Sequence, residues 1–271
     1  MQGLPGQGAI APVSGALIAR AGVAPVFREP SLRTEQVTQL VLGETARVLD
    51  REGDWRRIRT DDDGYEGWVN AGYTLEVEPL AATEWRRLAR GWSEGAVVRV
   101  GSGLARLPVR ARVGLKGATV RLPDGREGKI IAGSVVAKED ATRSAQAESS
   151  WLWAIRVFAG TPYQWGGVTP WGVDCSGLVQ TTFRARGVEL PRDAALQMDL
   201  GDVVRPVNRL PGDLLFFTER GDRVTHVAIA GEDDTLVHST LSCGGFVAER
   251  WAPGTRAAFL RDRLVGVRRV E

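Results

Sequence analysis

The sequence predicts an α+β protein in which two small β-barrels precede a C-terminal domain with helices and an antiparallel sheet. Residues 63–72 (DGYEGWVNAG) recur as residues 124–133 (DGREGKIIAG), at an offset of 61 residues. Asp-Gly between alternating apolar residues is a hairpin signal, so the repeat predicts two barrels of short strands. After residue 150, two helical segments come before four strand-like segments, an order typical of α+β domains.

Length, charge and cysteine content limit the possible classes of protein. A chain of 271 residues can form two or three domains, and 35 basic residues nearly balance 33 acidic ones without clustering. The apolar stretch 9–19 is short, contains Gly and Pro, and lacks the features of a secretory signal. Two cysteines are too few for a disulfide scaffold. We therefore expect a cytoplasmic monomer that binds neither nucleic acid nor membrane, or else a secreted protein whose leader is missing.

A polar segment separates the barrels from the C-terminal domain. Residues 137–150 are rich in Ala and Ser and lack strand periodicity, so they are interpreted as a linker. Ser149 or Ser150 is a suitable N-cap for a helix, and Gly160 and Pro162 end it. The predicted domains are a first barrel with an N-terminal extension (1–80), a second barrel (81–137), a linker (138–150) and the C-terminal domain (151–271).

Cys175 is the first candidate for chemistry. It follows Asp174, a suitable N-cap, and begins a helical segment with an apolar face. A thiol in the first helical turn is expected to have a lowered pKa, and the free backbone N–H groups there can stabilise an oxyanion. The alternative is a small apolar residue that only packs. The preceding segment 160–174 is rich in Gly and aromatic residues, which favours a cleft wall over a core.

The only two histidines lie on one predicted hairpin, residues 224–240. His226 and His238 share a face of the sheet only if the connection has an odd length, for example residues 230–234. In that register His226 can deprotonate the thiol and His238 can orient His226. Each histidine alone is equally compatible with a half-buried strand residue that has a satisfied hydrogen bond.

A zinc site and a disulfide are the other interpretations of these residues. Cys175, His226, His238 and Cys243 are separated by 51, 12 and 5 positions, whereas structural zinc sites usually contain close ligand pairs. A Cys175–Cys243 disulfide conflicts with a cysteine-poor chain. We therefore predict no metal and no cofactor.

Several motifs of the C-terminal domain resemble the NlpC/P60 family of cysteine peptidases over most of residues 151–271. They are GTPYQWGG and DCSGLVQ, followed in order by PRDAALQ, PGDLLFF, THVAIA and VHST. The resemblance implies a papain-like α+β core in circularly permuted order, with Cys175 as nucleophile, His226 as base and His238 as the third residue. The implied substrate contacts are Tyr163, Trp165, Asp174 and Ser176.

Residues 20–135 look like two bacterial SH3-type barrels, in agreement with the internal repeat. The segments VFREPS and GYEGWV are similar to the first barrel of family members that cut murein peptides with a free N-terminal L-Ala. That similarity implies that Glu29 and Tyr65 close the cleft around the peptide amine. From the residues alone, the pair Tyr65 and Trp68, absent from the second repeat, fits a contact surface and barrel packing equally well.

The resemblance implies hydrolysis of the bond between γ-D-glutamate and a diamino acid, meso-diaminopimelate or L-Lys, in murein peptides. A free-amine requirement would direct the enzyme to peptide recycling. Three alternatives remain open at this point. They are a secreted hydrolase of polymeric wall, an amidase or acyltransferase with the same Cys-His-His set, and a non-catalytic wall-binding protein.

Overall fold

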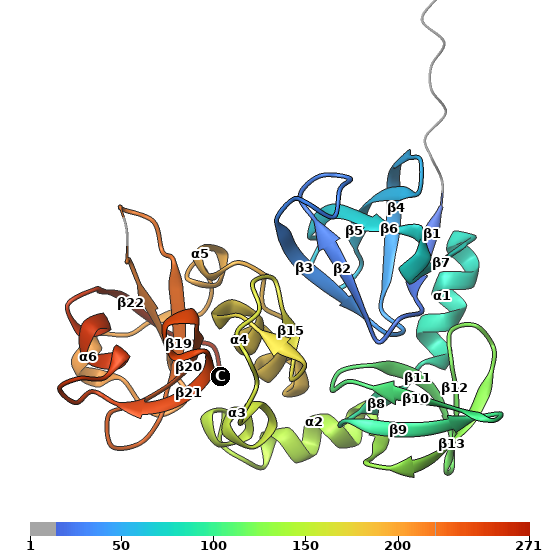
Figure 1. The fold of residues 1–271 in the computed structure, drawn as a ribbon. Coiled ribbons are helices and arrows are strands. Elements are labelled where there is room, and N and C mark those ends of the chain that lie inside the picture. Colours follow the sequence, from blue (N-terminus) through green and yellow to red (C-terminus); the bar gives the residue numbers. More distant parts are fainter. Residues whose placement is uncertain (1–14, 220) are drawn as a thin grey trace, which may run out of the picture.

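A computed structural model describes residues 15–219 and 221–271, which form two barrels and a mixed C-terminal domain (Figure 1). The first barrel is a seven-stranded sheet of order β3-β2-β6-β5-β4-β1-β7. Its core is made of the small and β-branched residues that alternate along these strands. The strands are β1 (Ala16–Ala19), β2 (Val23–Phe27), β3 (Gln36–Val41), β4 (Thr45–Glu52), β5 (Trp55–Thr60), β6 (Glu66–Asn70) and β7 (Thr74–Val77).

The second barrel has the same topology, which confirms the repeat seen in the sequence. Its sheet order, β10-β9-β13-β12-β11-β8-β14, is that of the first barrel shifted by seven strands. Gly67 and Gly128 occupy equivalent positions in the two repeats. A Cβ atom would lie only 2.6 Å from a valine methyl group at Gly67 and 2.4 Å from one at Gly128, so both positions require glycine. The strands are β8 (Gly91–Ser93), β9 (Ala96–Val100), β10 (Gly103–Leu107), β11 (Arg112–Lys116), β12 (Thr119–Arg121), β13 (Glu127–Ala132) and β14 (Val135–Ala137).

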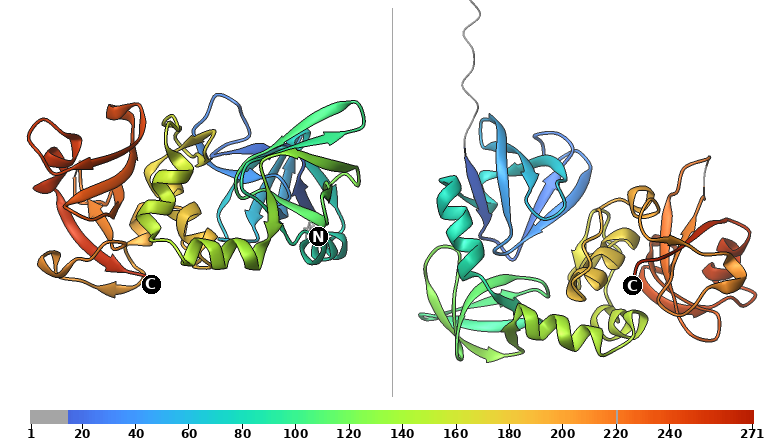
Figure 2. Two further views of the ribbon diagram at one scale, coloured as in Figure 1. Left: turned by 90° about the horizontal axis from the view of Figure 1, so that it is seen from below. Right: turned by 180° about the vertical axis from the view of Figure 1, so that it is seen from behind.

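Two helices join the three bodies. Helix α1 (Pro79–Leu88) connects the barrels, and α2 (Lys138–Gln146) runs from the second barrel to the C-terminal domain (Figures 1 and 2). The segment interpreted as a linker is therefore a helix along most of its length. Its short apolar stripe, Ala141 and Ala145, packs in the same core as the helices of the C-terminal domain. No helix in the described part of the chain is long and apolar enough to cross a membrane.

The C-terminal domain places its helices against a six-stranded antiparallel sheet of order β17-β22-β18-β19-β20-β21. Helix α4 packs on β19 and β20 and on the short hairpin that precedes it. The elements are α3 (Ser150–Phe158), β15 (Val168–Thr169), β16 (Gly172–Val173), α4 (Cys175–Ala185), α5 (Ala194–Gln197), β17 (Asp202–Val203), β18 (Leu214–Phe217), β19 (His226–Ala230), β20 (Thr235–Thr240), β21 (Gly245–Arg250), α6 (Arg256–Arg261) and β22 (Leu264–Arg269).

Helix α4 is buried along its whole length, whereas its sequence predicts an apolar stripe on one face. It lies between the C-terminal sheet and the barrels, which cover its polar side (Figure 1). Gln180 donates a hydrogen bond of 2.8 Å to Asp63 of the first barrel, and the Thr181 hydroxyl accepts one of 3.1 Å from Arg110 of the second barrel. The polar face of α4 is thus an interdomain surface.

A buried ion-pair cluster joins all three bodies at this surface. Arg110 of the second barrel donates to Glu44 of the first barrel at 2.5 Å, and both side chains are almost inaccessible to solvent. Arg184 of α4 pairs with Asp62 at 3.1 Å, and Arg112 pairs with the same carboxylate at 2.8 Å. Although burial opposes it, the charges of Arg112 and Arg184 lower the pKa of Asp62 to about 2. The first barrel is therefore fixed relative to the C-terminal domain by charges rather than by apolar packing alone.

Candidate active site

The local sequence around Cys175 explains why the thiol stands at the start of a helix. Asp174 has extended backbone geometry, and its carboxylate accepts a hydrogen bond of 2.7 Å from the backbone N–H of Gly177. Its second oxygen accepts one of 2.8 Å from the N–H of Gly166 in the preceding loop. Asp174 therefore caps α4 and ties the Gly-rich loop to it, leaving Cys175 at the first helical position.

Arg192 is a fully buried residue that the sequence analysis did not single out. It donates to Asp174 at 2.5 Å, to the Ser176 hydroxyl at 2.7 Å and to the Thr38 hydroxyl at 3.1 Å. It thus links both neighbours of the nucleophile to the first barrel. Only the PRDAALQ motif indicated this residue, and Asp174 and Ser176 accordingly belong to the framework around the thiol.

The two histidines meet on one face of the sheet. Ile229 lies opposite Val237 and Ala230 opposite Leu236, which leaves a five-residue connection, 231–235. The expected odd-length connection is therefore confirmed, one position later than the suggested 230–234. Nε2 of His226 lies 2.8 Å from Nδ1 of His238, and both rings are buried.

Glu249 on β21 extends this pair and was also missed by the sequence analysis. Its carboxylate lies 3.3 Å from Nε2 of His238 and accepts a hydrogen bond of 2.6 Å from the N–H of Ala257 at the start of α6. Burial opposes ionisation, yet the hydrogen bonds from His238 and Ala257 keep the pKa of Glu249 below its ordinary value. Glu249 is therefore an ionised carboxylate that can only accept hydrogen bonds.

This carboxylate determines the protonation of both imidazoles. Because Glu249 only accepts, neutral His238 carries its proton on Nε2 and accepts at Nδ1. His226 then donates through Nε2, and its lone pair is left on Nδ1. That nitrogen is the one directed away from the relay, and the ring shares a cavity of about 740 Å³ with Cys175. The arrangement has the form of a nucleophile, a base and an orienting chain.

Two hollows meet at Cys175. The larger one is lined by His226 and Cys175 together with Glu219 and Arg256, which form an ion pair with each other. A second hollow, of about 320 Å³, extends from Cys175 towards the first barrel. Tyr163, Trp165, Cys175 and Thr225 line both of them. A substrate that spans both hollows would place its scissile bond at the thiol.

The first barrel supplies one wall of the smaller hollow. Tyr65 donates a hydrogen bond of 3.2 Å to Asp193, which lies just before α5, and both residues line the hollow. Glu35 lines it too and accepts a hydrogen bond of 2.8 Å from the indole N–H of Trp165. Of the aromatic pair in the first repeat, Tyr65 therefore faces the cleft, whereas Trp68 is not among the lining residues.

Glu29 lies elsewhere, and the structure corrects its expected position in the cleft. Its side chain is exposed and is not among the residues that line either hollow. The reason is the loop after β2, where the carbonyl oxygen of Glu29 accepts a hydrogen bond of 2.7 Å from the N–H of Ser31. The chain turns back there, and Glu35, immediately before β3, is the acid that reaches Trp165.

The thiol has a raised pKa, contrary to the sequence expectation. Cys175 is only 9% exposed, and burial followed by the charge of Asp174 raises its pKa to about 12. Arg192 and the N–H groups of Val227 and Ser176 act in the opposite direction without reversing the shift. Burial, His238 and Arg256 lower the pKa of His226 well below its ordinary value. The resting pair is therefore a neutral thiol and a neutral imidazole.

This pairing predicts a broad pH plateau for turnover. Protonation of His226 removes the base, and its lowered pKa moves that loss below about pH 6.5, the ordinary value for imidazole. The raised pKa of Cys175 keeps the thiol proton in place up to strongly alkaline pH. We expect kcat/KM, which reports ionisations of the free enzyme, to lose activity from His226 protonation only below pH 6.5 and to show no loss from Cys175 up to about pH 10. Stopped assays in overlapping buffers would measure this, and an acid limb at or above pH 6.5 would contradict it.

The second cysteine lies outside this site. Cys243 is an exposed free thiol in the turn after β20, and Cys175 is also free. Within residues 15–219 and 221–271, no three His, Cys, Asp or Glu side chains are grouped so as to hold a metal ion.

Comparison with known proteins identifies the families that these regions match. Residues 160–268 match the NlpC/P60 family, and residues 26–72 match the bacterial dipeptidyl-peptidase SH3 domain. A γ-D-glutamyl-L-lysine dipeptidyl-peptidase of Bacillus cereus is 28% identical over 233 residues, which are 74% of this chain and 66% of that protein. The murein DD-endopeptidase/LD-carboxypeptidase MepS of Escherichia coli is 33% identical over 128 residues, which are 47% of this chain and 68% of MepS.

A solved structure supports the fold over nearly the whole chain. The crystal structure of an NlpC/P60 family protein from Bacillus cereus covers 94% of this chain, and the chain covers 99% of it. The TM-score is 0.75 at 19% sequence identity. The arrangement of SH3-like barrels and a papain-like C-terminal domain is therefore shared with that protein.

Proposed function

This chain belongs to the NlpC/P60 family, and from its similarity to γ-D-glutamyl-L-lysine dipeptidyl-peptidases we propose that it hydrolyses the bond between γ-D-glutamate and the diamino acid of murein peptides. The observation that supports this most directly is the relay from Glu249 through His238 to His226, in one cavity with Cys175. A peptidase also agrees with the names of the relatives.

The proposed reaction proceeds through a thioester. The sulfur of Cys175 attacks the γ-carbonyl carbon of D-glutamate, and the thiol proton passes to Nδ1 of His226. Backbone N–H groups at the start of α4 and the Tyr163 hydroxyl stabilise the oxyanion; burial raises the pKa of Tyr163, so it remains a donor. The C–N bond breaks as His226 protonates the leaving amine. Water then attacks the thioester with His226 as base, which releases the acid and restores the thiol.

We assign the hollow on the barrel side to the acyl part of the substrate and to its free N-terminal amine. Burial raises the pKa of Asp193, and in the described part of the chain no Lys or Arg forms an ion pair with it. Its hydrogen-bond partner is the neutral hydroxyl of Tyr65. Glu35 adds a second carboxylate, which Arg28 of the same hollow already pairs at 2.5 Å, so Asp193 is the main acid for the amine. A peptide ammonium beside Asp193 would stabilise its carboxylate, whereas with an acylated amine only the charge of Arg192 and the hydrogen bond from Tyr65 oppose the effect of burial.

The test compares L-Ala-γ-D-Glu-meso-diaminopimelate with its N-acetylated form. We expect kcat/KM to be at least about tenfold higher for the free amine, because a desolvated charge pair is lost with the acetylated peptide. Asp193→Asn and Glu35→Gln should reduce this ratio, while Glu29→Gln, a matched change outside the cleft, should leave it unchanged. Cys175→Ala, which lacks the proposed nucleophile, is the inactive control. Equal cleavage of both peptides would contradict the amine site but keep the peptidase.

Preference for a free amine would direct the enzyme to released peptides, because the stem peptides of polymeric wall are acylated at that nitrogen. Recycling of small peptides, and a cytoplasmic location for it, therefore form part of this proposal. If neither peptide is cleaved, the same Cys-His-His set would instead serve another acyl substrate, as in an amidase or an acyltransferase.

A further inference from the structure

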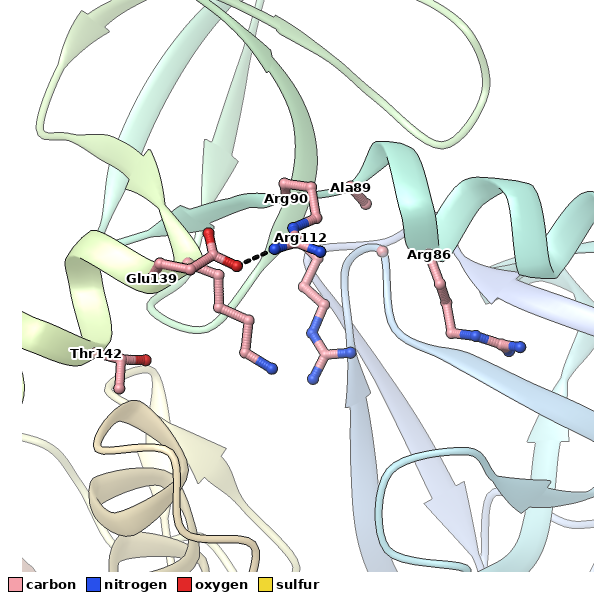
Figure 3. A pocket seen from close by; sticks show the side chains of 8 residues that line it. Arg86, Ala89, Arg90, Arg112, Glu139 and Thr142 are labelled. Carbon is pink, nitrogen blue, oxygen red and sulfur yellow. Dashed lines mark hydrogen bonds and ion pairs between the residues drawn. The ribbon is translucent and has the colours of Figure 1, made fainter.

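A hollow of about 400 Å³ lies apart from Cys175, where the two barrels meet α2 (Figure 3). Its lining carries four cationic side chains and one carboxylate. The residues come from the first barrel, α1, the second barrel and α2. They are Gly43, Arg86, Ala89, Arg90, Arg112, Lys138, Glu139 and Thr142.

The nearby carboxylates do not use all of this positive charge. Arg86 pairs with Asp61, Arg90 with Glu139, and Arg112 with Asp62. After these pairings the side-chain ammonium of Lys138 has no hydrogen bond or ion pair in the described part of the chain. The Nε atom of Arg112 is buried and likewise has no hydrogen-bond partner among the described residues. The hollow thus contains one ammonium and one guanidinium N–H that lack acceptors.

The lowered pKa of Lys138 agrees with an ammonium that lacks a counter-ion. Burial and then the charge of Arg112 lower the pKa of Lys138, and the more distant Glu189 and Asp62 only partly offset this. Arg184 acts in the same direction as Arg112. An anion placed beside the ammonium would reverse the effect of Arg112.

We propose that this hollow binds a small multivalent oxyanion, of the phosphate or polycarboxylate class. Lys138 and Arg112 supply the charge, and Thr142 supplies a hydroxyl donor. Arg86 and Arg90 also line the hollow (Figure 3). The volume exceeds that of a single phosphate group, and the lining carries four cationic side chains against one carboxylate, so a ligand with more than one negative charge fits best.

An anion at this position would contact the second barrel and both connecting helices at once. Arg112 belongs to the second barrel and Lys138 to α2, while Arg86 belongs to the helix that leaves the first barrel. Arg112 also shares Asp62 with Arg184 of α4. The bound ion would therefore stabilise the barrel arrangement that holds Tyr65 at the cleft, without touching the reacting groups.

Thermal unfolding and isothermal calorimetry with inorganic pyrophosphate test this proposal, and both are independent of any peptidase activity. At constant ionic strength, pyrophosphate should raise the Tm of the intact chain in a saturable manner. Lys138→Met should weaken binding at least about tenfold, since one charge-assisted contact is lost. Lys129→Met, an exposed lysine on β13, is the matched control and should bind as the wild type does.

Two results would overturn the proposal. One is a Tm that rises no more with pyrophosphate than with sodium chloride of equal ionic strength. The other is equal binding by the wild type and Lys138→Met. Thr142→Val gives a second variant with a lost donor, in case Lys138→Met unfolds early. A parallel citrate titration separates the two sources of ligand, because the tighter of the two anions identifies phosphate or carboxylate chemistry.

Discussion

Glu249→Gln is expected to lower kcat by about 10²- to 10³-fold with little change in KM, by analogy with triads in which the wrong histidine tautomer costs about 10⁴-fold. A glutamine whose amide N–H faces Nε2 of His238 moves the His238 proton to Nδ1, and it also gives up the bond from Ala257, because one oxygen of Glu249 accepts both. His238 then donates to Nε2 of His226, and the His226 proton moves to Nδ1. The lone pair needed to accept the thiol proton is lost, although all three side chains remain in place.

The measurement is steady-state kinetics with the free-amine peptide, combined with ¹⁵N NMR of the two imidazoles to identify the tautomers. Glu232→Gln, an exposed change in the connection between β19 and β20, is the matched control. Because Glu249 also accepts the N–H of Ala257, the Tm must be shown to stay near the wild-type value. A well-folded Glu249→Gln protein with wild-type kcat would refute the orienting role.

Sequence reasoning found the residues whose positions depend on local structure. Cys175 follows from an N-cap and a helical period, and the pairing of His226 with His238 follows from the parity of a hairpin. Glu249 could not be found in this way, because β21 pairs with β20 and brings it beside His238 only in the folded sheet. No local pattern distinguishes this glutamate from the other exposed or partly exposed acids of the chain.

Residues whose surroundings depend on contacts between domains were also beyond prediction from local sequence. Glu29 and Glu35 are both acids of the β2–β3 loop, and only the path of that loop decides which one meets Trp165. The thiol pKa was expected to fall because the helix start was considered alone. Burial and the charge of Asp174 reverse that expectation. Both errors concern surroundings that only the packed domains supply.

Glu44→Gln is expected to reduce the free energy of unfolding by about 3–5 kcal/mol, the cost of removing one partner from a buried ion pair. Glu44 is 2% exposed and Arg110 is 3% exposed, so the unpaired guanidinium cannot be hydrated by a small rearrangement. Burial and Arg184 already lower the pKa of Arg110, and Glu44 is the main group that opposes them. The change keeps the side-chain volume, so the loss reports charge rather than packing.

Glu66→Gln is the matched control, since Glu66 pairs with Arg57 at 3.0 Å on the exposed surface of the same barrel and should contribute no more than about 1 kcal/mol. Urea unfolding would be followed by tryptophan fluorescence and by circular dichroism, because three domains need not unfold together. Equal losses in the two variants would show that the cluster does not hold the domains. A large loss confined to Glu44→Gln would also predict a higher KM for the free-amine peptide. The reason is that Tyr65 reaches Asp193 only while the first barrel stays docked on α4.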